Sequence, residues 1–137
     1  MRNEDRIKQV SLWLDENFPT PYPVRVKWCR DIPVSKDELL VVGNHYPGGH
    51  FAECYYEHPI IVIRLSKRKN RDISIALDSL LHEWGHAVTM MNSRMHNRME
   101  KSGLLQDHRD EFWVVFGKIY RAFYDEGGVL ESRNYVL

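Results

Sequence analysis

The chain has 137 residues, of which 43% are hydrophobic and 28% are charged, a balance typical of a globular domain. Lys+Arg and Asp+Glu both number 19, so no excess charge favours nucleic acid or anionic lipid as a partner. No apolar run of about 18 residues is present, which excludes a membrane-spanning helix. The N-terminus lacks the apolar core of a signal peptide, so we expect a cytoplasmic protein in which Cys29 and Cys54 are reduced thiols. The length fits a single domain over residues 1–137.

The predicted elements begin with a helix from about Glu4 to Asn17, where apolar side chains recur at helical spacing. Asn3 is the expected N-cap of this helix. Three prolines between residues 19 and 23 then impose an extended backbone, because proline disfavours helix at its own position and at the preceding one. The alternation of apolar and basic residues from Val24 to Trp28 predicts a half-buried strand.

Further strands are predicted between residues 39 and 65. Leu39–Val42 is an apolar run that ends at a glycine, and Phe51–Tyr56 and Ile60–Leu65 are apolar runs separated by a proline-containing turn. The sequence therefore predicts three or four strands. The basic run at residues 67–71 that follows could contact phosphate, although such a run is more often a solvated loop.

A long helix is predicted next, with Asp72 as its N-cap and a broad stripe of apolar side chains that continues to Met91. After a polar interval, a last helix should begin near Asp107 and end near Tyr124, because aromatic residues recur there every four positions. Gly127-Gly128 should close this helix. The order helix, strands, helix and helix predicts an α+β domain whose strands form one sheet.

The centre of the long predicted helix carries His82-Glu83-Trp84-Gly85-His86, which matches the HExxH motif. Residues i and i+4 share one helix face, so the two imidazoles can converge on one Zn²⁺. Glu83 is placed to accept a proton from a zinc-activated water and to deliver it to a leaving amine. Gly85 costs about 1 kcal/mol relative to alanine in a helix, which indicates that backbone or substrate comes close there. The non-functional alternative is a partly exposed helix face with two hydrogen-bonded histidines.

A catalytic zinc needs a third protein ligand and an open coordination position. The metzincin spacing requires a histidine where this chain has Asn92, so that class is excluded. His96 would lie too far along the helix from His86 to share an ion with it. His108 is the best remaining candidate and Glu111 is the second, followed by Asp107 and Asp110. The spacing alone does not decide between His108 and Glu111.

Leu81–Ala87 and His108–Trp113 together resemble the SprT-like metallopeptidases, whose HExxH motif is followed some twenty residues later by a histidine four positions before an aromatic residue. His108 lies 22 residues after His86 and four before Phe112. The resemblance implies a minimal zincin-like fold, in which a small, mostly antiparallel sheet packs on the active-site helix and further helices lie at each end of the chain. It implies a zinc metallopeptidase that acts on a protein or peptide substrate. The expected zinc ligands are His82, His86 and His108, and the expected general base and acid is Glu83.

The family's link to the repair of DNA–protein crosslinks would imply a nucleic-acid partner, which the net charge does not support. A compact form of this kind fits a bacterial or phage protein. One alternative is a deformylase-like hydrolase with Cys54 as third ligand, but the Gly-Leu-Ala-Ala and Glu-Gly-Cys-Leu signatures of that family are absent. Another alternative is a zinc-stabilised binding module without catalysis, and the presence of Glu83 argues against it because a structural site needs no general base.

The sequence leaves two supporting roles open. Asp78 lies one turn before His82 and is either an acceptor that orients this histidine or a solvated helix charge. Several residues could stabilise the oxyanion of a tetrahedral intermediate, and the sequence does not choose among them. They are His45, His50, Arg109, Tyr120 and Tyr124.

Overall fold

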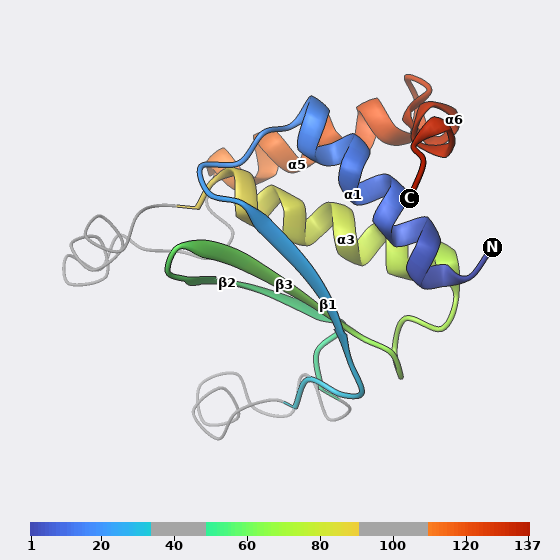
Figure 1. Ribbon diagram of the computed structural model, residues 1–137. Coiled ribbons are helices and arrows are strands. Elements are labelled where there is room, and N and C mark those ends of the chain that lie inside the picture. Colours follow the sequence, from blue (N-terminus) through green and yellow to red (C-terminus); the bar gives the residue numbers. More distant parts are fainter. Residues whose placement is uncertain (34–48, 91–109) are drawn as a thin grey trace.

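Helices cover one face of a three-stranded sheet in the computed structural model, whose described residues are 1–33, 49–90 and 110–137 (Figure 1). This arrangement is the predicted α+β domain. The elements are α1 (Asn3–Asn17), β1 (Val24–Cys29), β2 (Ala52–Glu57), β3 (Ile60–Ser66), α3 (Ile73–Val88), α5 (Asp110–Tyr124), α6 (Gly128–Glu131) and the short 3-10 helix η1 (Ser132–Asn134). Among these described residues, no helix is both long and apolar enough to cross a membrane.

The sheet is mixed, and the expectation of a mostly antiparallel sheet was wrong. Its strand order is β1-β3-β2, with β3 antiparallel to β2 and parallel to β1. The hairpin between β2 and β3 reverses the chain, and β1 pairs with the second strand of that hairpin, so β1 and β3 run in the same direction. The predicted strand at Leu39–Val42 lies outside the described residues.

Helix α1 starts one residue earlier than the sequence predicts. Arg2 is its N-cap and makes no side-chain capping bond, so the prediction that Asn3 caps the helix was wrong. Asn3 is instead the first helical residue, and its amide donates a hydrogen bond of 2.8 Å to the carbonyl oxygen of Arg71. This bond ties the start of α1 to the loop before α3. The predicted apolar face is buried, together with one further aromatic residue; its residues are Ile7, Val10, Trp13 and Leu14.

The loop between β3 and α3 fixes the start of the long helix. Asp72 is the N-cap, as predicted, and its side chain accepts a hydrogen bond of 2.8 Å from the backbone N–H of Ser74. Asn70 is buried and donates to two carbonyl oxygens, one of which belongs to Phe51 at 2.7 Å. Its own side-chain oxygen accepts a 2.7 Å bond from Ser79 on α3. The basic run is therefore anchored to the sheet and to α3 through Asn70.

The C-terminal part of the chain returns to α1. Helix α5 ends at Tyr124, as predicted, whereas its predicted start at residues 107–109 lies outside the described residues. Gly127 then adopts a positive φ of 95° and precedes the short helix α6. The indole N–H of Trp13 donates to a carboxylate oxygen of Glu131 at 3.1 Å, which fastens α6 to α1.

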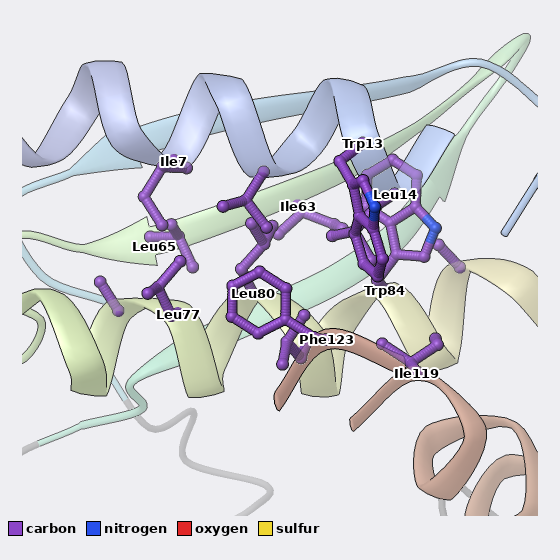
Figure 2. Close-up of a cluster of buried hydrophobic side chains, with 14 of the residues drawn as sticks. Ile7, Trp13, Leu14, Ile63, Leu65, Leu77, Leu80, Trp84, Ile119 and Phe123 are labelled. Carbon is purple, nitrogen blue, oxygen red and sulfur yellow. The ribbon is translucent and has the colours of Figure 1, made fainter. Parts of the chain in front are cut away.

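The main hydrophobic core lies between the sheet, α1, α3 and α5 (Figure 2). Figure 2 shows Ile63 and Leu65 of β3 facing the helices, with Trp84 of α3 directed toward Trp13 and Leu14 of α1. The Trp84 indole N–H also donates to the carbonyl oxygen of Phe18 at 2.9 Å, just beyond the end of α1. This packing fixes how α3 is rotated about its own axis above the sheet.

Candidate metal centre

His82 and His86, which we call the histidine pair, lie on the C-terminal half of α3. Their ring centroids are 5.1 Å apart and their planes meet at 69°. Two imidazoles that bind one tetrahedral zinc at about 2.0–2.1 Å have ring centroids about 5 Å apart, so the separation suits a shared zinc. Both side chains are partly exposed. The pair therefore fits the predicted role in its spacing, its chemistry and its access to solvent.

Two aromatic residues of α5 form one wall of this site. The ring of Phe112 stacks on His86 with centroids 4.2 Å apart, and it meets the ring of His82 edge-on at 5.0 Å. Phe116 also meets His82, at 5.4 Å. The sequence pattern predicted only that these aromatic residues share one face of a helix. That this face lies against the histidine pair depends on the packing of α5 against α3, which has no local signal.

Gly85 is explained by this same packing. A Cβ atom at position 85 would lie 2.9 Å from Cε2 of Phe112 and 3.4 Å from Cβ of Phe116. The group that comes close to Gly85 is the ring of Phe112, not another stretch of backbone, and the approach of a substrate stays a prediction. The missing side chain lets α5 pack closely against the turn of α3 between the two histidines.

Glu83 is the buried acidic residue of the motif, with 8% of its surface exposed. Helix α3 packs on β2 and β3, and the side chain of Cys54 on β2 faces the helices. Burial raises the pKa of the Cys54 thiol, and the negative charges of Glu83 and Glu53 raise it further. Glu83 thus lies beside the histidine pair in the motif and near enough to Cys54 for its charge to act on the thiol.

The predicted third ligand, His108, lies outside the described residues, as does Arg109. Within the part of the chain that the structure describes, no three or more His, Cys, Asp or Glu side chains form a group that could hold a metal ion. Glu111 and Cys54, the two alternative ligands, are both described, and neither completes such a group with the histidine pair. Glu111 is exposed in the first turn of α5.

Asp78 and Tyr124 interact with each other at the far end of the α3–α5 interface. The Tyr124 hydroxyl donates a hydrogen bond of 2.7 Å to Asp78, so this carboxylate is not simply a solvated helix charge. Burial raises the pKa of Tyr124, and the hydrogen bond to Asp78 raises it further. Of the other oxyanion candidates, Tyr120 is 43% exposed and His50 is partly buried, while His45 is outside the described residues.

Comparisons of the chain with protein-family models, with curated proteins and with solved structures gave no match.

Proposed function

We propose that this protein is a zinc-dependent metallopeptidase of the SprT-like type. The observation that carries the proposal is the histidine pair, whose ring centroids are 5.1 Å apart on one face of α3, together with the buried Glu83 between them in the sequence. A hydrogen-bonded histidine pair on an ordinary helix face would not require a buried carboxylate beside it. The arrangement of the three side chains supports a hydrolytic site more than a purely structural one.

The residues divide the chemistry between them. A bound zinc would polarise the scissile carbonyl and make an attacking water more acidic. Glu83 would accept the proton of this water on its carboxylate and then donate it to the nitrogen of the departing amine. The burial of Glu83 favours this role, because bulk water has little access to the carboxylate while it holds the proton.

His108 is the proposed third ligand. It precedes Phe112 by four residues, and the Phe112 ring contacts both members of the histidine pair. A described residue four positions after His108 is therefore in contact with the pair, which supports a ligand role for His108. The positive end of the α5 dipole also stabilises the negative charge of Glu111, which lies in the first turn of that helix, without any need for a metal ion.

Strand β2 offers a place for the substrate backbone. It is paired with β3 on one side, and no strand among the described residues pairs with its other side. An extended peptide could add along this edge through main-chain hydrogen bonds, which recognise a backbone without selecting a sequence. Because α3 packs on β2 and carries Glu83 among its buried residues, a peptide bound there would lie near the helix that carries the proposed general base.

The first experiment tests the metal and the base together. The purified protein should contain about one zinc per chain, and a strong chelator should remove both zinc and hydrolysis of an unfolded test protein. The substitution Glu83→Gln should lower hydrolysis by about 10²- to 10⁴-fold while the zinc content stays near normal. Zinc-loaded wild-type protein that cleaves no peptide would favour a zinc-stabilised binding module, and a chain that binds no zinc would refute both functions.

The second experiment identifies the third ligand by zinc titration with a competing chelator. We expect His108→Ala to abolish measurable zinc affinity, whereas Glu111→Gln should weaken it by at most about 10- to 100-fold. The two residues are only three positions apart, so each variant is a control for a general disturbance of this segment. The opposite ranking would assign a His-His-Glu site and would argue against the SprT-like assignment.

A further inference from the structure

A cavity of about 810 Å³ lies on the opposite side of α3 from the histidine pair. We call it the α1–β1 cavity, because α1, β1 and the connection between them form most of its wall. Trp84 contributes to this wall. It is two residues from each histidine and thus about 200° around the helix from both. The cavity is therefore separate from the candidate metal centre, although both use the same five-residue motif.

The outer edge of β1 borders this cavity. In the parallel pairing with β3, the carbonyl oxygens of Pro23 and Cys29 accept bonds from Ile61 and Lys67. Every second residue of β1 thus bonds to β3, and the intervening residues direct their N–H and C=O groups away from it. No strand within the described residues pairs with this outer edge. The edge consequently offers a row of backbone donors and acceptors to an added strand.

The side chains of β1 divide between its two faces. Val24, Val26 and Trp28 line the cavity, whereas Arg25 and Lys27 alternate with them and are exposed on the other face of the sheet. Within the described part of the chain, neither cation forms an ion pair. An added strand would therefore meet an apolar surface with one set of its side chains and two positive charges with the other.

Helix α1 supplies the opposite wall of the cavity. Ile7 and Leu12 contribute apolar surface there, and Leu12 is 43% exposed. The same wall also carries the charged residues Glu4, Lys8 and Asp15. A volume of about 300–1,000 Å³ is typical of pockets that enclose a ligand. The α1–β1 cavity is within this range, so it can receive several side chains of an extended segment.

We propose that the α1–β1 cavity and the outer edge of β1 together bind an extended segment of a partner protein, in which apolar and acidic residues alternate. The segment would add to the sheet as a strand next to β1. Its apolar side chains would enter the cavity between β1 and α1, and its acidic side chains would pair with Arg25 and Lys27. This site is independent of the proposed peptidase activity and would exist in a protein without any.

Calorimetric titration of the full chain at low ionic strength tests the proposal. The probe is a peptide blocked at both ends, in which four valines alternate with three glutamates. We expect one peptide to bind per chain. A peptide of the same composition with its valines grouped together should bind at least about 10-fold more weakly, because strand pairing places alternate side chains on opposite faces.

Charge reversal on the protein locates the binding site. The double variant Arg25→Glu/Lys27→Glu should weaken binding of the glutamate peptide about 10-fold and should bind the corresponding lysine peptide better than the wild type does. Lys118→Glu, an exposed charge change on α5, should have no effect. This change of preference from the glutamate peptide to the lysine peptide also shows which edge of the sheet binds the peptide. A peptide bound at the edge of β2 would not respond to the charge reversal on β1.

A change within the cavity provides the second test. Leu12→Asp should weaken binding of the glutamate peptide, and Leu130→Asp, which changes a leucine that is 69% exposed on α6, should not. Absence of binding by the wild type would overturn the proposal, as would binding that neither Leu12→Asp nor the charge reversal affects. Sedimentation that shows a wild-type dimer dissociated by Leu12→Asp would assign the edge of β1 to a second copy of the chain instead.

Discussion

Replacing Gly85 by alanine would test how tightly α5 packs against the histidine pair. The added Cβ would lie 2.9 Å from Cε2 of Phe112, which is closer than carbon atoms approach without displacement. Phe112 is fully buried, with His86 stacked on it at 4.2 Å and Phe116 at 5.7 Å in a nearly parallel orientation. The ring therefore has little room to move, and any movement would be passed on to His86.

Two opposing effects set the magnitude of this change. Alanine favours a helix over glycine by about 1 kcal/mol, since it restricts the unfolded chain and has the better helix propensity. Overpacking of a well-filled core typically costs about 1–3 kcal/mol. We expect the overpacking to prevail, so that Gly85→Ala lowers the free energy of unfolding by up to about 2 kcal/mol. Zinc affinity should fall as well, because the displaced Phe112 ring moves His86.

Urea unfolding of protein that has been freed of metal with a chelator measures the change in the free energy of unfolding without any contribution from metal. Gly117→Ala is the matched control, because it lies in the neighbouring helix and a Cβ there would meet nothing within 4 Å. It should raise stability by up to about 1 kcal/mol. The double variant Gly85→Ala/Phe112→Leu should regain part of the loss. If Gly85→Ala stabilises the protein as much as Gly117→Ala does, the close packing of Phe112 on α3 is refuted.

Two further predictions concern the C-terminal region. A Cβ at Gly128 would lie 2.6 Å from Cζ2 of Trp13 and 2.7 Å from the Cα of Phe123. Gly128→Ala should therefore lower the free energy of unfolding, measured by urea titration, by about 1–3 kcal/mol. An unchanged value would contradict this contact. The pKa of Tyr124 is raised by burial and by its bond to Asp78, so its contribution to stability is complete below the unfolded-state pKa of about 10 and is lost at higher pH. Tyr124→Phe should therefore lower the free energy of unfolding by about 0.5–1.5 kcal/mol at pH 8. The variant should also lose less thermal stability than the wild type between about pH 9 and 11. An equally steep loss in the variant would show that the Tyr124–Asp78 bond does not cause this pH dependence.

The local elements could be predicted because their signals lie in neighbouring residues. Alternation identified β1, helical spacing identified α1 and α3, and the short side chain of Asp72 identified the start of α3. The position of the histidine pair on one helix face follows from the same geometry. These features depend on contacts within one or two turns, which a sequence pattern records directly.

The order and direction of the strands could not be predicted in this way. Whether β1 pairs with β2 or β3 depends on how the chain returns after residue 33, and no alternation of apolar residues encodes that path. The role of Asn3 was mistaken for a similar reason. Its amide is occupied by the carbonyl oxygen of Arg71, which is remote in sequence and becomes available only when α1 packs beside α3.

The five residues of the motif show why a local pattern could predict residues that share a helix face but not what surrounds them. Glu83 is buried, Gly85 receives the ring of Phe112 from α5, and Trp84 is directed toward α1 and bonds to the carbonyl oxygen of Phe18 just beyond that helix. These contacts on different sides of α3 leave the helix only one rotation about its axis. A shift by one residue, or about 100°, would bury a histidine against α1 and turn the tryptophan away from it. The packing of Trp84 and Gly85 is therefore what sets the direction of the histidine pair in the proposed site, although neither residue would touch a metal or a substrate there.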